Sequence, residues 1–77
     1  MFIRDKQNTV SNSVRAARIS CSLTQEELAE KVQATRQTII AIEKGNYVPS
    51  VLLALKIAVT LNGKVDDLFE ISNYEKI

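Results

Sequence analysis

Residues 23–45 read LTQEELAEKVQATRQTIIAIEKG and contain two helix-start signals in close succession. The first signal pairs Thr24 with Glu27 at the spacing of a capping box, in which each side chain bonds the other residue's free backbone N–H. Leu23 and Leu28 flank this box at the positions of a hydrophobic staple, which directs the entry of the chain into the helix. We therefore expect a helix to begin at Thr24.

A second helix is expected after a very short turn at Gln33 and Ala34. Thr35 can cap this helix, its body covers residues 36–43, and Gly45 can end it in a left-handed conformation. The apolar residues of the two helices then point inward and are Leu28, Ala29, Val32, Ile39 and Ile42. Two helices joined by so short a turn, the second with a polar outer face, make a helix-turn-helix.

Helical patterns continue on both sides of this pair. Residues 12–21 form an amphipathic helix before it, while residues 50–61 and 65–69 form a longer helix and a short last turn after it. The 50–61 helix is apolar almost all round, with an expected inward stripe of Val51, Ala54, Leu55, Ala58 and Leu61. Phe2–Arg4 and Phe69–Ile71 alternate enough to pair as a small two-stranded ribbon, and frayed ends are the alternative.

The length and composition of the chain are those of one small folded domain. We assign its 77 residues to a single domain over residues 1–77, with a core over about 12–69 and the helix-turn-helix at 24–45. An apolar share of 45% is ordinary for such a domain. No apolar run is long enough to span a membrane, and the N-terminus lacks the pattern of a signal peptide, so a cytoplasmic location is expected.

The chain has one cysteine, Cys21, and no histidine. This composition excludes an internal disulfide, most zinc sites and all catalysis that relies on imidazole. There is also no glycine-rich phosphate loop and no nucleophile beside a base. We therefore expect a protein that is not an enzyme, with no metal site, no cofactor and no small-molecule ligand.

The formal net charge of +1 is low for a DNA-binding domain, so the distribution of charge matters more than its sum. Glu26, Glu27 and Glu30 cluster in the first helix of the helix-turn-helix. Residues 36–44, in contrast, include Glu43 as their only acid. Any surface that attracts DNA must therefore be built on this second segment.

Several separated elements of the chain match one known family in register. These elements are Leu23–Val32, Thr35–Ile39, Ile42–Gly45 and Pro49–Ser50. Together they resemble the Cro/repressor (Xre-type) family of bacterial and phage regulators, over about residues 14–69. The resemblance implies an all-α, five-helix, lambda-repressor-like DNA-binding domain, in which the helix at 36–43 lies in the major groove of double-stranded DNA.

The resemblance places Arg36 and Gln37 at base-reading positions, and their chemistry suits this task. Arginine can donate two hydrogen bonds to guanine and glutamine can pair bidentately with adenine, each worth about 1–3 kcal/mol of discrimination. Arginine binds phosphate just as readily, so a backbone contact is the alternative for Arg36. Ile40 can touch a thymine methyl or serve only in packing, and Ala41 can contribute little readout.

Other residues match positions that contact the DNA backbone or support the helices. Gln25 matches the family position that holds a phosphate and braces the base-reading helix. Further backbone contacts are expected from polar groups around that helix, namely Thr35, Thr38, Lys44 and Asn46. Arg18 and Glu43 match a structural ion pair of the family, so we do not expect them to contact DNA.

The chain departs from the family pattern at Ser22, Gln33 and Lys64. Ser22 and Gln33 stand where glycine is usual, and a left-handed backbone would cost a non-glycine residue about 1–2 kcal/mol. Lys64 stands where a serine or threonine cap is expected. None of the three lies on the expected reading surface, so they concern stability more than function.

The apolar helix at 50–61 indicates a partner surface, because a domain of this size has little interior. The expected interface residues are Leu52, Ile57, Val59 and Leu61. Two copies would bind a near-palindromic operator with half-sites about 34–36 Å apart. We expect a sequence-specific transcriptional regulator that acts as a repressor and a homodimer. A protein-interaction or antitoxin-like adaptor module is the alternative.

Overall fold

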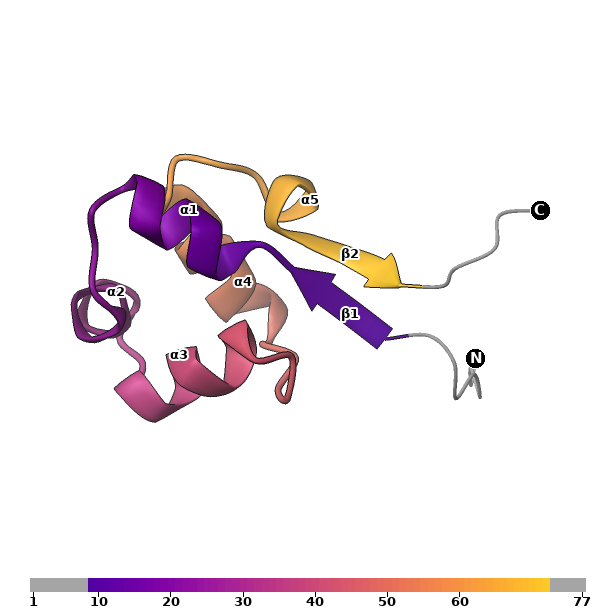
Figure 1. The fold of residues 1–77 in the computed structure, drawn as a ribbon, viewed down its shortest axis with the longest axis horizontal. Helices are drawn as coiled ribbons and strands as arrows, with labels where there is room; N and C mark the ends of the chain where they lie inside the picture. Colours follow the sequence, from indigo (N-terminus) through magenta and orange to yellow (C-terminus); the bar gives the residue numbers. More distant parts are fainter. Residues whose placement is uncertain (1–8, 73–77) are drawn as a thin grey trace.

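The computed structural model describes residues 9–72, which form five helices and one two-stranded sheet (Figure 1). The elements in chain order are β1 (Thr9–Asn12), α1 (Val14–Ser20), α2 (Gln25–Val32), α3 (Arg36–Glu43), α4 (Val51–Thr60), α5 (Val65–Leu68) and β2 (Phe69–Ser72). None of the helices in this described part is long and apolar enough to cross a membrane. The expected five-helix arrangement and small ribbon are confirmed.

The helix starts follow the local signals of the sequence. The Thr24 hydroxyl accepts a hydrogen bond from the Glu27 N–H at 3.0 Å, and the Glu27 carboxylate accepts from the Thr24 N–H at 2.9 Å. The predicted capping box of α2 is therefore confirmed. Thr35 accepts from the Thr38 N–H at 3.1 Å and caps α3, while Ser50 caps α4 in the same way.

Four helices end at a residue with a left-handed backbone. These residues are Ser22, Gln33, Gly45 and Asn62, with φ of 58°, 61°, 80° and 60°. In each case the next residue donates its N–H to a carbonyl five positions earlier, as Ala34 does to Ala29 at 2.9 Å. Lys64 is the third departure from the family pattern and directly precedes α5. Its backbone N–H donates to the Asp67 carboxylate at 3.0 Å, but its own side chain makes no capping bond to the helix.

The core lies between α1, α2, α3, α4 and α5. Its buried apolar residues are Val14, Leu28, Ala29, Val32, Ile39, Ile42, Ile57, Ala58, Leu61 and Leu68. The inward residues predicted for α2 and α3 are confirmed. The inward stripe predicted for α4 is partly wrong, because Val51 and Leu55 are exposed and Ile57 takes their place. A helix that is apolar almost all round does not mark its own inward side, so its neighbours decide the rotation.

The ribbon joins the two ends of the described chain. β1 pairs antiparallel with β2, and Asn12 lies opposite Phe69. The predicted strand at Phe69–Ile71 is present, but its partner is Thr9–Asn12; the expected partner Phe2–Arg4 lies outside the described residues. The Ser13 N–H donates to the Leu68 carbonyl at 2.9 Å and extends the pairing to the start of α1. As a result α1 begins later than predicted, and the ribbon projects from one end of the helices (Figure 1).

Candidate nucleic-acid interface

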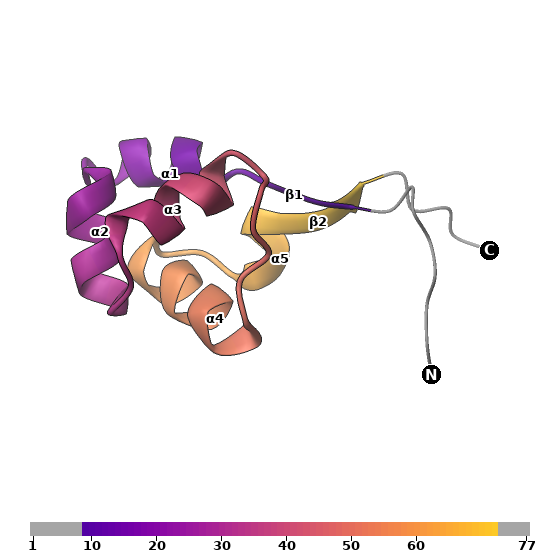
Figure 2. The same ribbon diagram turned by 90° about the horizontal axis from the view of Figure 1, so that it is seen from below.

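Helix α3 has one buried side and one side open to solvent. Ile39 and Ile42 are fully buried against the other helices, whereas Arg36 and Gln37 are exposed at the N-terminal end. Ile40, one turn on, is half-buried at the surface. Figures 1 and 2 together place α3 at one side of the molecule, with no other helix between it and solvent on that side. Its open side can therefore reach into a groove of about its own width.

The first turn of α3 gathers polar hydrogen-bonding groups. The Thr35 and Thr38 hydroxyl oxygens lie 3.0 Å apart, and the Thr35 hydroxyl also caps the helix. The N-terminal end of a helix carries partial positive charge and free backbone N–H groups, which together bind anions. Lys44 and Asn46 are exposed just beyond the opposite end of α3. Anion-binding groups thus flank Arg36 and Gln37 along the helix.

An ion pair connects α1 to the C-terminal end of α3. Arg18 Nε lies 2.7 Å from one carboxylate oxygen of Glu43, and Nη2 donates to the other oxygen at 3.2 Å. Arg18 also donates to the Leu23 carbonyl at 2.8 Å. The hydrogen bonds that Arg18 donates to Glu43 hold the pKa of Arg18 above its ordinary value, so the guanidinium keeps its charge well beyond neutral pH.

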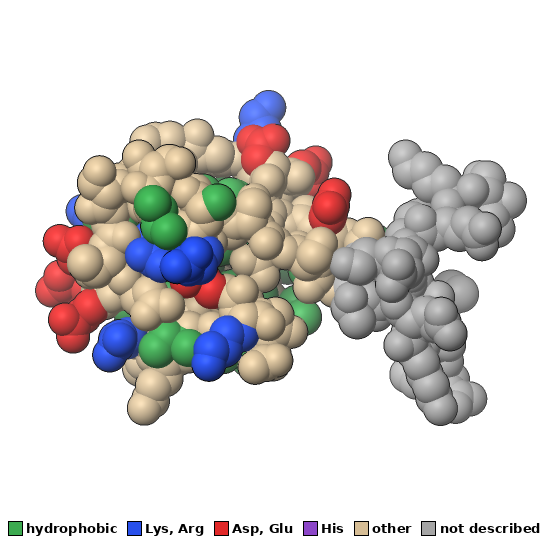
Figure 3. Space-filling view, in the orientation of Figure 1, with side chains coloured by type: hydrophobic (Ala, Val, Ile, Leu, Met, Phe, Trp, Pro, Cys, Tyr) green, Lys and Arg blue, Asp and Glu red, His purple; other side chains and the backbone are tan. Residues whose placement is uncertain are grey.

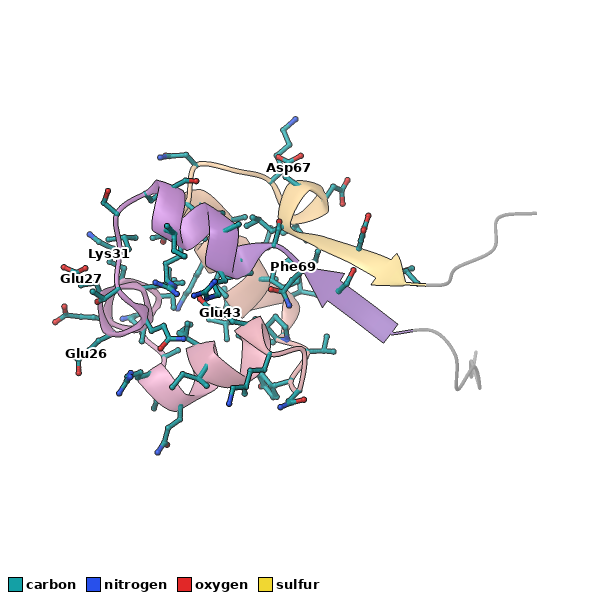
Figure 4. The ribbon with its side chains drawn as sticks, viewed as in Figure 1. Glu26, Glu27, Lys31, Glu43, Asp67 and Phe69 are labelled. Atoms are coloured by element: carbon teal, nitrogen blue, oxygen red, sulfur yellow. The ribbon has the colours of Figure 1, made fainter. Side chains whose placement is uncertain are left out.

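Burial of this pair shapes the electrostatics of α3. The Glu43 side chain is 3% exposed and the Arg18 side chain 10% exposed. Figure 4 shows Glu43 between α1 and α3. The only acid of residues 36–44 is therefore neutralised and turned away from solvent, so it does not repel a phosphate at the open side of the helix.

Gln25 joins α2 to the same ion pair. Its side-chain N–H donates to Glu43 at 3.1 Å, which places the first residue of α2 against the end of α3. A primary amide has a second N–H, which remains available for a contact outside the protein. Gln25 is half-buried, at the edge of the open side of α3. The geometry thus shows the bracing contact directly.

On the face drawn in Figure 3, basic side chains gather over α3, while acidic side chains gather over α2 and again near α5. The basic side chains over α3 lie along the lower edge of the molecule, and the acidic ones over α2 lie on its left edge. Glu26 and Glu27 are labelled on that left edge in Figure 4, and Glu26 lines a surface hollow together with Arg36. The basic region over α3 includes the exposed Arg36 and Lys44. Despite the low net charge, exposed cations thus lie along α3.

Arg15 is exposed on α1, and its place in the sequence pattern indicated no role. Arg15 lies three residues before Arg18, and residues at this spacing are neighbours on a helix surface. Since Arg18 points at α3, Arg15 adds a second cation close to the same side of the molecule. The three-residue spacing of the two arginines within the predicted first helix is the sequence feature that indicates this position of Arg15.

The residues predicted to form a dimer interface fall into two groups. Leu52 and Val59 are exposed, at 64% and 76%, and are available to a partner. Ile57 and Leu61 are 0% and 6% exposed and belong to the core, so their assignment to the interface was wrong. The exposed apolar residues that replace them on α4 are Val51 and Leu55. We call Val51, Leu52, Leu55 and Val59 the α4 surface.

Residues 14–68 match the sequence model of the helix-turn-helix family. The chain belongs to this family, in its Xre-type branch. It is 50% identical over 60 residues to YgzD, an uncharacterised HTH-type transcriptional regulator of Bacillus subtilis, covering 78% of this chain and 91% of YgzD. An uncharacterised HTH-type transcriptional regulator of Methanothermobacter thermautotrophicus is 54% identical over 57 residues, covering 73% and 83% of the two chains.

Solved helix-turn-helix structures have the same fold. The restriction-modification controller protein C.AhdI of Aeromonas hydrophila superposes with a TM-score of 0.66 at 28% identity, covering 70% of this chain and 82% of C.AhdI. The clp gene regulator ClgR of Corynebacterium glutamicum gives 0.67 at 26% identity, covering 70% of this chain and 57% of ClgR. The predicted lambda-repressor-like fold is confirmed, and the chain is a transcriptional regulator with a helix-turn-helix DNA-binding fold.

Proposed function

We propose that this helix-turn-helix protein is a sequence-specific repressor, which binds a near-palindromic operator as a homodimer with α3 in the major groove. The observation that carries the proposal is the open side of α3. It presents Arg36 and Gln37 at its N-terminal end, while the only acid of the segment is buried in an ion pair. Recognition helices of this motif contact base edges through their N-terminal residues.

In this complex Arg36 and Gln37 read bases and Ile40 lies against a thymine methyl. The flanking polar groups hold the DNA backbone, namely Gln25, Thr35, Thr38, Lys44 and Asn46. Backbone contacts fix the register of a protein on the duplex, and base contacts select the sequence. Two or three base contacts of about 1–3 kcal/mol each give one copy only modest discrimination.

A second copy doubles the number of base contacts, and the α4 surface supports such a dimer. Four large apolar side chains are exposed along one helix, more than a soluble monomer usually leaves in one place. Beside them lies an apolar hollow of about 210 Å³, lined in part by Val10, Val48 and Phe69. A second copy seated on this region would bury both features and bring a second α3 helix into the complex.

A bound dimer would cover operator DNA and exclude RNA polymerase from an overlapping promoter. Occupancy alone is sufficient for this effect, so repression needs no further catalytic or ligand-binding group. Binding-site selection from random DNA tests the proposal. The expected product is a near-palindrome with half-sites about one helical turn apart.

A salt titration on the selected fragment separates this proposal from the adaptor alternative. The affinity of a DNA-binding protein falls by roughly 0.9 log unit per phosphate contact for each log unit of salt. We expect the slope of log affinity against log salt concentration to correspond to several phosphate contacts per copy. Failure to enrich any sequence, together with weak binding to every fragment, would contradict the proposed function and favour a module that binds protein.

A further inference from the structure

The side chain of Asn12 bonds two helices at once. Its Nδ2 donates to the Ile42 carbonyl at 2.8 Å, near the C-terminal end of α3. Its Oδ1 accepts from the Val14 N–H at 3.1 Å, the first backbone N–H of α1. Both bonds are partly buried: the first N–H of α1 gains a partner from Asn12, and the Ile42 carbonyl, which already accepts from the Gly45 N–H at 2.9 Å, gains a second donor.

Asn12 is also the last residue of the ribbon. It lies opposite Phe69 in the register of β1 and β2, and the next residue, Ser13, donates to the Leu68 carbonyl at 2.9 Å. Figure 1 shows the end of β1 meeting the start of α1, above the C-terminal end of α3. The backbone of Asn12 is thus held by strand pairing while its side chain holds α3.

Besides the Gln25 amide, two polar connections to the preceding part of the chain hold the C-terminal end of α3. Arg18 binds the Glu43 side chain, and Asn12 binds the backbone of the neighbouring Ile42. A side-chain ion pair leaves a helix free to rotate by small angles, because both side chains can follow. A bond to a backbone carbonyl restrains the helix axis itself, and the strand pairing behind Asn12 makes that restraint stiff.

We propose that Asn12 is a positioning residue, through which the β1–β2 ribbon sets the orientation of α3 on DNA. This inference rests on the proposed function for its consequence, since α3 is the helix that would present Arg36 and Gln37. The bidentate base contacts of such residues tolerate little displacement. Contacts to phosphate are less demanding, so a tilt of α3 should reduce specific binding more than general attraction to DNA.

Two substitutions test the role of the Asn12 amide. Asn12→Asp keeps the oxygen that accepts from Val14 but places a second oxygen, with no proton to donate, against the Ile42 carbonyl. Asn12→Ser keeps a possible cap for α1, is neutral, and cannot span the gap to Ile42. The matched control is Asn62→Asp, which makes the same change of charge at an exposed turn between α4 and α5, on the far side of the molecule from α3 (Figure 1).

The orientation of α3 relative to α1 is measured first, without DNA, by residual dipolar couplings of the folded proteins. We expect a changed orientation in both Asn12 variants and the wild-type orientation in Asn62→Asp. Unchanged couplings in Asn12→Ser would overturn the proposal whatever the protein does with DNA. If Asn12→Asp does not fold, Asn12→Ser alone decides the question.

Affinity for the selected operator and for random DNA is measured second. We expect the ratio of the two affinities to fall about three- to tenfold in the Asn12 variants, the effect of one lost hydrogen bond, and to stay unchanged in Asn62→Asp. A purely structural loss would lower both affinities together and leave the ratio intact, which would overturn the proposal. Absence of sequence preference in the wild type would contradict the proposed function, while the dipolar couplings would still decide whether Asn12 positions α3.

Discussion

Gln33 adopts a left-handed backbone in the turn between α2 and α3, with φ of 61°. A non-glycine residue pays about 1–2 kcal/mol for this conformation. The Gln33 side chain is exposed, and the bond that it accepts from Lys56 at 2.9 Å lies at the surface. An exposed bond of this kind contributes little, so most of the backbone strain remains uncompensated.

Gln33→Gly should therefore stabilise the protein. We expect the free energy of unfolding to rise by about 0.5–1 kcal/mol, since the relief of left-handed strain exceeds the extra chain entropy of glycine. Urea denaturation measures the change. Gln33→Ala is the control, because it removes the bond to Lys56 and keeps the strain. A glycine variant no more stable than the alanine variant would show that the turn is not strained.

Arg36 and Lys44 distinguish base reading from backbone contact at the level of single residues. Arg36→Ala should weaken operator binding by about 1–3 kcal/mol and relax the preference at one base pair. Lys44→Ala should weaken all sequences alike and reduce the salt slope by about one. Binding to a panel of single-base operator variants measures both effects. A uniform loss across the panel for Arg36→Ala would place Arg36 on phosphate.

Polar contacts connect the elements of this fold in addition to apolar packing. The Arg18–Glu43 pair joins α1 to α3, and Gln25 adds α2 to the same cluster. Since both charged side chains are almost fully buried, removal of one partner leaves the other charge without compensation. The cluster therefore controls whether α1, α2 and α3 stay together.

Glu43→Gln should destabilise the protein by about 3 kcal/mol, because the buried Arg18 charge loses its partner. Replacement of both partners, Arg18→Met with Glu43→Leu, should cost less than Glu43→Gln alone, since no buried charge remains. Thermal unfolding of the variants measures these differences. If the double variant is the least stable of the set, the ion pair makes a net stabilising contribution that exceeds the cost of burying its two charges, which would contradict this prediction.

At the scale of the whole molecule, a net charge of +1 provides little general attraction to DNA. Specific binding then depends on a few contacts from each copy and on the presence of two copies. The α4 surface is the described apolar region suited to hold them together, since its side chains project from a helix already packed on its other side. Oligomeric state and operator affinity should therefore change together.

Leu52→Ser with Val59→Ser should convert the dimer into a monomer. Both side chains are exposed in one copy, so the stability of the monomer should change by only about 0.5 kcal/mol. Sedimentation at micromolar concentrations measures the mass, and operator binding should weaken in parallel. Ile71→Ser, an exposed apolar residue on the ribbon, is the control. A wild-type protein that sediments as a monomer at high micromolar concentration would refute the dimer.

Much of the site could be predicted from residues close together in the chain. The starts of α2 and α3 are predicted by their capping residues, which are Thr24 with Glu27 and Thr35. The 3.6-residue period of apolar residues predicts which side of α3 stays open to solvent. The inward side of α4 could not be predicted, because apolar residues surround it and Ile57 is chosen only by its neighbours. The role of Asn12 could not be predicted either, because its bond to Ile42 joins residues 30 positions apart in the sequence.

The sequence by itself determined the helix-turn-helix, its caps and the polar face of α3, because each of these depends on groups within about one helical turn of each other. Only the tertiary structure decided that β1 is Thr9–Asn12, that Ile57 and Leu61 are core, and that the Asn12 amide bonds the Ile42 carbonyl. These outcomes depend on contacts between distant segments. Local propensity carries no information about such contacts. Where several tertiary arrangements agree equally well with the local sequence pattern, packing selects one of them.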